Sequence, residues 1–294
     1  MVLVQALPQP MKLRDVFLAL AVATMFGGGV VFSKAAITHF PPILLSAIRF
    51  TLVGLLLVWF VPVPKGRLGR IFLAALTSAT ISYSLVFSGL KHIDVALMII
   101  VVQLEIPFAA LLAWLIFKDP LGWRGTLGMI IAFAGIGVIA GAPEERGALF
   151  PVFLVMAGSL AWAVGQIIIK SIGSIGGFTM IAWVAIFTGP QLLVTSWLIE
   201  DNHWESIRSA PMIVWVAVVY LVVVMTAIGY AAWYSLLGRY DVNQVIPFML
   251  LVPLVTIAGG VIFLGESMTM ARLLGGAMVI AGVAAMVVRR SRSE

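Results

Sequence analysis

Long apolar stretches alternate with short polar turns along most of this 294-residue chain. Each stretch holds about 20 mainly apolar residues, the length that an α-helix needs to cross the hydrocarbon core of a bilayer. In lipid only helices and closed barrels satisfy their own backbone hydrogen bonds, and stretches of this length favour helices. The pattern therefore predicts an all-α integral membrane protein. We place its ten transmembrane helices at 16–33, 42–61, 71–90, 95–117, 123–141, 150–170, 178–199, 212–237, 243–264 and 271–288.

The polar segments between the stretches are too short to fold alone, so we expect no soluble domain. We divide the chain into a short disordered lead at 1–11, two halves of five helices at 12–142 and 149–289, and a basic tail at 290–294. The composition agrees, because 62% of the residues are hydrophobic, 10% are charged and the mean hydropathy is +1.15. A soluble domain of this size needs more polar surface to cover such a core.

The distribution of charge indicates a membrane partner rather than a nucleic acid. The net charge is +6, but with the N-terminus inside, twelve Lys and Arg residues fall on the cytoplasmic side and five on the other. This positive-inside bias predicts a multi-pass protein of a bacterial inner membrane with both termini in the cytoplasm. The Glu200–Pro211 segment is then extracytoplasmic, and we expect no nucleic-acid partner.

The residues that most site chemistry needs are scarce in this chain. It has no cysteine, which excludes disulfides and Cys-based metal sites, and its three histidines (His39, His92 and His203) lie outside the predicted helices. The chain has no Walker A sequence for ATP, and the apolar stretches hold no catalytic constellation. We therefore expect no cofactor, no metal and no enzymatic activity.

The second half of the chain repeats the first. Shifting the sequence by 136 residues aligns the first stretch with the sixth, as for Gly29 and Gly165. Shifting it by 147 residues aligns the third to fifth stretches with the eighth to tenth, as for Tyr83 and Tyr230. Because each repeat holds an odd number of helices, the second copy is inverted in the membrane. Inverted repeats are typical of secondary transporters.

These features resemble the EamA branch of the drug/metabolite transporter superfamily. The resemblance rests on two inverted five-helix repeats, on a Gly…Lys ending of the first and sixth stretches, and on Pro107 and Pro253 in the fourth and ninth. An acidic turn before the Gly-rich fifth and tenth stretches adds to it. Within this branch the chain resembles YddG-type exporters of aromatic and other neutral amino acids. The resemblance implies a central cavity walled by the first four helices of each half.

Aromatic and amide side chains near the middle of the stretches are the candidates for binding a solute. Trp162 and Gln166 lie one helical turn apart and share a face, where a ring beside an amide suits a small amphipathic solute. Helix packing is the alternative explanation for each of them. The complete set of candidates is Phe26, Tyr83, Gln103, Trp162, Gln166 and Tyr230.

Two charged residues, Arg49 and Glu105, fall inside the predicted helices away from their ends. A carboxylate at midspan costs about 2.5–3.5 kcal/mol on insertion scales, so Glu105 needs a partner, a cavity or a proton. One hypothesis makes Glu105 a contact for a solute ammonium group or a proton carrier. The other makes it a structural group that a neighbour neutralises, with Arg49 as the candidate neighbour.

Glycines of the fifth and tenth stretches predict close helix packing. Some of them recur seven residues apart and so share a helix face, and two others form a GxxxG pair. A homodimer contact is the alternative use of such a face, although we favour a monomer. The glycines are Gly128, Gly135, Gly275 and Gly282 at the seven-residue spacing, and Gly137 and Gly141 in the GxxxG pair.

The function that these features favour is secondary transport of a small neutral or zwitterionic solute, with the lipid bilayer as the other partner. Amino acids, including aromatic ones, fit best, and the resemblance favours export by alternating access. The alternatives are a carrier for another metabolite, such as a sugar phosphate or nucleotide sugar, and a drug efflux protein. A channel or a membrane-embedded enzyme is the alternative from a different class.

Overall fold

The structure, a computed structural model, describes residues 11–118, 122–173, 175–237, 239–240 and 242–290. Every regular element within these ranges is a helix, which confirms the expected all-α architecture. The expected lead at 1–11 and the expected tail at 290–294 lie almost entirely outside the described residues.

The helices follow one another along the chain with short connections. Two of the irregular segments, η2 and η4, are π-helical, and η1, η3 and η5 are 3₁₀-helical. In chain order the elements are α1 (Leu13–Ala36), α2 (Pro42–Leu57), η1 (Val58–Phe60), α3 (Leu68–Ala75), η2 (Leu76–Ile81), α4 (Ser82–Leu90), α5 (Val95–Val102), α6 (Glu105–Phe117), α7 (Gly122–Gly141), η3 (Pro143–Ala148), α8 (Leu149–Ile172), α9 (Gly177–Ile199), α10 (His203–Ser209), α11 (Met212–Val219), η4 (Tyr220–Ile228), α12 (Gly229–Leu237), α13 (Val242–Val245), η5 (Ile246–Leu250), α14 (Leu251–Leu264) and α15 (Met270–Arg290).

Within the described residues, nine helical segments are long and apolar enough to cross a membrane. Each of the nine overlaps one of the predicted stretches. The remaining stretch, 243–264, corresponds to a shorter apolar helix over Phe248–Leu264. The nine segments are Leu13–Ala36, Pro42–Phe60, Leu68–Leu90, Val95–Phe117, Gly122–Gly141, Glu145–Ile172, Gly177–Ile199, Met212–Leu237 and Met270–Val287.

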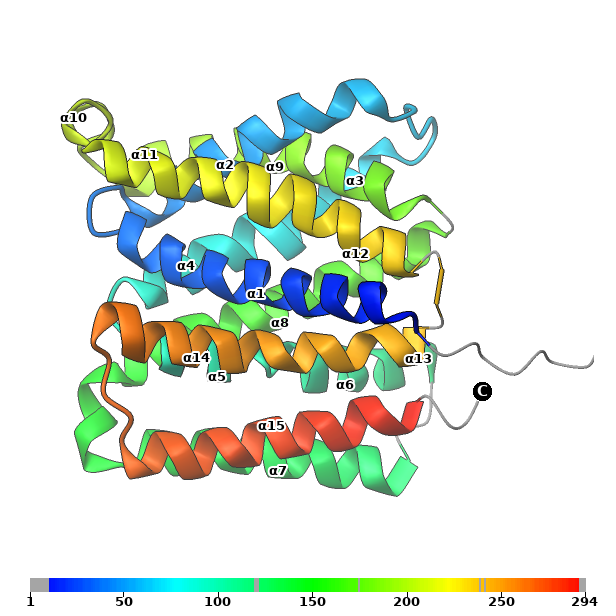
Figure 1. Cartoon of the computed structure of the whole chain (residues 1–294), viewed down its shortest axis with the longest axis vertical. Coiled ribbons are helices and arrows are strands. Elements are labelled where there is room, and N and C mark those ends of the chain that lie inside the picture. The colour runs from blue at the N-terminus through cyan, green and yellow to red at the C-terminus, as the bar shows by residue number, and fades with distance from the viewer. Residues whose placement is uncertain (1–10, 119–121, 174, 238, 241, 291–294) are drawn as a thin grey trace, which may run out of the picture.

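The long helices lie side by side in one bundle (Figure 1). α7 packs along α15 at one edge, and α2 packs along α9 near the opposite edge. The start of α1 and the end of α15 lie at the same end of the bundle, which we call the terminal end (Figure 1). The short helix α10 lies at the other end, which we call the α10 end.

Several elements recur at the spacing of the sequence repeat. The bounds of α1 and α8 coincide at the shift of 136, and both helices have 24 residues. The bounds of α4 and α12 coincide at the shift of 147, and each of these helices directly follows a π-helical segment. These two pairs of helices therefore start and end at equivalent residues, and the π-helical segments before α4 and α12 end at equivalent residues.

The packing of α7 against α15 depends on glycines that the sequence pattern identified. A Cβ added to Gly135 would lie 2.5 Å from the carbonyl oxygen of Gly275, and one added to Gly128 would lie 2.6 Å from that of Gly282. Close helix packing at these four glycines is therefore confirmed. The expectation of close helix packing was wrong for the GxxxG pair of Gly137 and Gly141, because an added Cβ at either position meets no described atom within 4 Å. The alternative use of this pair in a homodimer contact stays a prediction.

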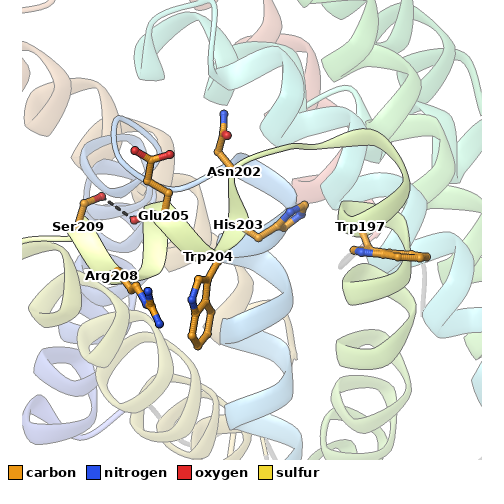
Figure 2. A pocket seen from close by; sticks show the side chains of 7 residues that line it. All are labelled: Trp197, Asn202, His203, Trp204, Glu205, Arg208 and Ser209. Atoms are coloured by element: carbon orange, nitrogen blue, oxygen red, sulfur yellow. Dashed lines mark hydrogen bonds between the residues drawn. The ribbon is translucent and has the colours of Figure 1, made fainter.

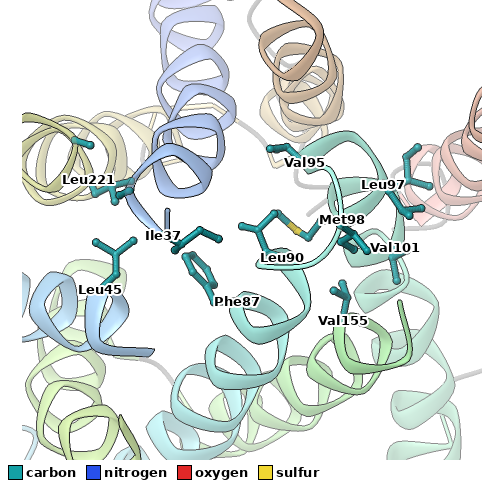
Figure 3. Close-up of a cluster of buried hydrophobic side chains, with 14 of the residues drawn as sticks. Ile37, Leu45, Phe87, Leu90, Val95, Leu97, Met98, Val101, Val155 and Leu221 are labelled. Carbon is teal, nitrogen blue, oxygen red and sulfur yellow. The ribbon is translucent and has the colours of Figure 1, made fainter. Parts of the chain in front are cut away.

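The largest group of buried apolar side chains, part of which is drawn in Figure 3, includes many residues from the α10 end of the bundle. Ile37 follows α1, Leu45 belongs to the start of α2, Phe87 and Leu90 to the end of α4, and Met98 to the start of α5. Two smaller clusters, around Ile71 and around Leu236, lie toward the terminal end. The buried side chains named here thus hold together the α10 ends of α1, α2, α4 and α5.

Carboxylates also hold helix starts at the α10 end. Glu266 accepts hydrogen bonds from the backbone nitrogens of Val95 and Ala96 at the start of α5, at 2.6 and 3.0 Å. Glu200 does the same for Ile43 and Leu44 at the start of α2, at 2.8 and 2.9 Å. The first backbone N–H groups of a helix lack partners within it, and a negative charge there is favourable.

A cluster of charged side chains around Arg272 joins three segments at the α10 end. The guanidinium of Arg272 binds Glu145 through Nε at 2.5 Å and through Nη2 at 3.2 Å, and it forms an ion pair with Asp94. Nearby, Lys34 Nζ donates to the carbonyl oxygens of Leu90 and Ile93 at 2.7 and 2.8 Å. These contacts tie the start of α15 and the end of α1 to the connections around them.

Candidate solute-binding site

Three membrane-spanning segments that carry predicted site residues, those of Tyr83, Gln103 and Tyr230, lose regular α geometry at midspan. η2 and η4 are π-helical, and α5 is separated from α6 by a turn at Gln103 and Leu104. Pro107 explains the turn, because it has no N–H to donate to the carbonyl of Gln103, which accepts instead from Ile106 N at 3.3 Å. Short π-helical segments are frequent at functional sites.

Gln103 and Glu105 flank this turn. Gln103 is buried, with 8% of its surface exposed, and Glu105 is half-buried in the first turn of α6. Two residues apart on a regular helix, these side chains would point to nearly opposite faces, but the turn at Gln103 and Leu104 interrupts the helix between them. Among the described residues, Glu105 and Arg49 form no ion pair, so the structure does not give Glu105 the neighbour that the structural hypothesis suggested.

Arg49 is the centre of a small polar and aromatic cluster in the bundle interior. It belongs to α2 and is 4% exposed. Its Nη2 donates to the hydroxyl of Thr226 in η4 at 3.1 Å, and Thr226 donates in turn to the carbonyl oxygen of Leu221 at 2.7 Å. Its guanidinium carbon lies 5.4 Å from the ring centre of Phe50 and 5.9 Å from that of Tyr83. The Nε of Arg49 is buried and has no hydrogen-bond partner among the residues that the structure describes.

Aromatic rings continue from this cluster along α4. The ring of Tyr83 meets that of Phe50 edge-on at 4.9 Å and stacks on that of Phe87 at 5.5 Å. The structure therefore brings two predicted residues, Arg49 and Tyr83, together. Sequence reasoning missed Phe50 and Thr226, because neither is charged or aligned with another candidate. We call Arg49, Phe50, Tyr83, Phe87 and Thr226 the Arg49 cluster.

A second aromatic pair joins α1 to α12. The ring centres of Phe26 and Tyr230 lie 4.9 Å apart, so these two predicted residues are also in contact. Gly229 makes room for them, because a Cβ there would lie 2.8 Å from Cε1 of Phe26. The repeat relates Phe26 to Trp162 and Tyr230 to Tyr83.

Trp162 and Gln166 lie on α8 and are both half-buried. Between them Gly165 packs against η2, where an added Cβ would lie 2.6 Å from the backbone nitrogen of Ser78. In the other half Gly29 packs in the same way against Met225 of η4, with Cγ at 2.9 Å. The equivalent glycines thus set α8 against η2 and α1 against η4.

A depression of about 770 Å³ opens on the surface at the α10 end, away from these residues (Figure 2). It lies where α9 ends and α10 begins, and none of the predicted site residues lines it. Its lining residues are Trp197, Asn202, His203, Trp204, Glu205, Arg208 and Ser209.

The bundle is that of a multi-pass membrane protein, and buried charges at midspan are the groups that mark solute pathways in such proteins. Two segments of the chain, residues 13–141 and 149–288, match the EamA-like transporter family. Together they cover most of the chain, which therefore belongs to this family. The resemblance drawn from the helical repeats and the prolines is thereby confirmed, and the family is one of transporters.

Relatives and a solved structure extend over the same region. A probable amino-acid metabolite efflux pump of Salmonella typhimurium is 30% identical over 93% of this chain and 94% of its own. A probable terminal-alkyne amino-acid exporter of Streptantibioticus cattleyicolor is 25% identical over 75% of this chain and 73% of its own. One solved crystal structure covers 96% of this chain and 100% of its own, with a TM-score of 0.64 and 17% identity, which supports the fold alone.

Proposed function

We propose that this protein is a secondary transporter that exports small neutral or zwitterionic solutes, amino acids including aromatic ones among them. The observation that carries the proposal is the Arg49 cluster, where one buried guanidinium stands against aromatic rings at midspan. A cation beside apolar rings complements a solute that has one anionic group and an apolar body. The names of the two relatives, an amino-acid metabolite efflux pump and an amino-acid exporter, point to the same solutes and the same direction.

The proposed architecture is ten transmembrane helices in two inverted repeats, at 12–142 and 149–289. The matching bounds of α1 and α8 and the family's two matched segments support it. We place the protein in the inner membrane with both termini in the cytoplasm, which makes the α10 end extracytoplasmic. The solute then binds between the two halves, in a cavity lined by the predicted aromatic and amide residues.

Alternating access is the proposed mechanism, and the packing of the two ends suggests which state the structure represents. The α10 end carries many residues of the largest apolar cluster and the ion pairs of Arg272, so we assign it as the closed end. Release of the solute then requires the α10 end to open while the terminal end closes. At the terminal end, Asp15 already binds Arg239 and the hydroxyl of Tyr240, both at 2.7 Å, and closing of this end adds to these contacts.

Carriage of sugar phosphates or nucleotide sugars is less well supported. Such polyanions need several cations in the membrane interior, whereas Arg49 stands as a single guanidinium in the cluster described above.

Uptake of a panel of labelled amino acids into proteoliposomes that contain the purified protein tests the proposal. We expect saturable uptake of phenylalanine and of other apolar amino acids, with no uptake into protein-free liposomes. Uptake of a sugar phosphate in place of every amino acid would contradict the proposed solute class.

A further inference from the structure

We propose that Arg49 binds the carboxylate of the transported solute, and that this solute is a monocarboxylate with an apolar or aromatic body. The inference rests on the proposed transport function and deepens it by assigning a protein group to the solute's negative charge. It starts from one observation, which is that the bundle buries a permanent positive charge without giving it a negative partner.

The charge of Arg49 is left unbalanced by its surroundings. Its side chain is 4% exposed, and none of the carboxylates among the described residues lies within ion-pair distance of it. The hydroxyl of Thr226 is neutral, and the rings of Phe50 and Tyr83 offer only the weaker attraction of a π face. Elsewhere in the bundle, buried charges are paired, as Arg272 is with Glu145. An anion from outside the chain can therefore compensate the unpaired positive charge of Arg49.

The donors of Arg49 are suited to a carboxylate. A guanidinium has five N–H donors in a planar fork, and two of them can hold the two oxygens of one carboxylate. The described residues engage Arg49 in one hydrogen bond, from Nη2 to Thr226, and leave the buried Nε without a partner. A carboxylate that reaches Nε supplies both the missing acceptor and the missing charge.

The neighbours of Arg49 select the rest of the solute. Phe50 and Tyr83 lie beside the guanidinium, and Phe87 extends the aromatic surface from Tyr83. These rings offer apolar area to a hydrocarbon or aromatic body next to the carboxylate. A single guanidinium balances one unit of negative charge, so a phosphate dianion is a poorer match than a monocarboxylate.

Arg49 also stands where the two halves of the chain meet. It lies on α2 of the first half and donates to Thr226 in η4 of the second half. Thr226 holds the guanidinium in place through Nη2, and a carboxylate that binds the remaining donors joins this contact between the halves. Binding at this point can therefore alter the contact between the halves, as alternating access requires.

The test measures equilibrium binding of three probes to the purified protein. The probes are phenylalanine, 3-phenylpropionate, which keeps the carboxylate but lacks the amine, and phenylalaninamide, which lacks the carboxylate. We expect the wild-type protein to bind phenylalanine and 3-phenylpropionate at least tenfold more tightly than phenylalaninamide, as the loss of a charged hydrogen-bonding partner implies.

Arg49→Lys is the diagnostic variant, because lysine keeps the positive charge but cannot form a bidentate contact with a carboxylate. We expect this variant to lose about tenfold or more in affinity for the two carboxylates and to bind phenylalaninamide as the wild type does. Arg124→Gln is the matched control, since Arg124 is exposed at the start of α7, and it should leave all three affinities unchanged. If Arg49→Lys does not fold, Thr226→Val replaces it, with a several-fold loss expected for the carboxylates alone.

Each outcome decides the proposal. An unchanged preference for the carboxylates in Arg49→Lys, or a wild-type protein that shows no such preference, overturns it. A lower melting temperature of Arg49→Lys with an unaltered preference assigns Arg49 a structural role and also overturns it. Binding of 3-phenylpropionate that depends on Arg49, combined with absence of amino-acid transport, leaves this inference intact and overturns the proposed function alone.

Discussion

Replacing Arg272 by glutamine should open the α10 end of the bundle. In the structure the side chain of Arg272 is 11% exposed and that of its partner Glu145 is 3% exposed, so their ion pair is shielded from water. The substitution leaves the carboxylate of Glu145 buried without its cation. Opening of the α10 end admits water to Glu145, and hydration of the carboxylate then relieves most of the free-energy cost of burying it unpaired.

The size of the effect follows from these burials. Removing one partner of a buried ion pair costs about 3–5 kcal/mol. The second partner, Asp94, is 37% exposed, so loss of the ion pair between Arg272 and Asp94 adds at most about 1 kcal/mol to the cost. If water reaching Glu145 relieves about 3 kcal/mol of this cost, the ratio of open to closed protein rises roughly 100-fold.

The absence of cysteine from the chain makes the assay direct. Ser46 lies three residues before Arg49, on the same face of α2 and toward the α10 end, and it is 1% exposed. A Ser46→Cys variant provides a single thiol, whose rate of labelling by a maleimide in detergent reports opening. Arg272→Gln should raise this rate by up to about 100-fold.

Arg208→Gln is the matched control, because Arg208 is an exposed arginine at the same end of the bundle, on α10. It should leave the labelling rate of the Ser46→Cys thiol unchanged. Equal labelling rates in the Arg272→Gln and Arg208→Gln proteins would refute the idea that the Arg272 ion pairs hold the α10 end closed.

Five further substitutions test other parts of the structure. Gly135→Ala should lower the melting temperature, because overpacking at the contact with α15 costs about 1–3 kcal/mol. Gly137→Ala should leave the melting temperature unchanged or raise it. Equal shifts in the two variants would contradict the packing of α7 on α15. Glu266→Gln should destabilise the protein by about 1 kcal/mol, because it weakens the charged cap of α5, and an unchanged melting temperature would exclude that role. Glu105→Gln should leave the pH profile of initial transport rates superimposable on that of the wild type, and a displaced profile would make Glu105 a proton carrier. Tyr83→Leu should lower transport of phenylalanine with little change in melting temperature, and parallel loss of both would favour a packing role.

The sequence predicts the helices well because burial in lipid depends on the composition of each segment alone. The apolar stretches therefore overlap the nine long helices, and the repeat identified glycines such as Gly135 and Gly275 that meet in space. The spacing of Gly137 and Gly141 misled, because a small-residue pattern defines a helix face but does not show that a neighbour covers it.

The candidate site is less visible in the sequence, because contacts between distant residues create it. Arg49 is conspicuous as a charge, but its hydrogen-bond partner Thr226 lies 177 residues away and is an ordinary residue of an apolar stretch. The π-helical segments η2 and η4 also leave no sequence signal that the apolar pattern reveals. The turn at Gln103 is partly foreseeable from Pro107, which cannot donate a backbone hydrogen bond.

The central claim is that the protein carries amino acids by alternating access, and trans-stimulation tests it most directly. Proteoliposomes that contain the protein are loaded with unlabelled phenylalanine, and the initial rate of entry of labelled phenylalanine is compared with that into empty proteoliposomes. The binding site of a carrier turns back toward the outside faster when it holds internal phenylalanine than when it is empty. We therefore predict that internal phenylalanine clearly raises the initial rate of entry of labelled phenylalanine. Equal entry rates with and without internal phenylalanine would indicate a channel, and they would contradict the account.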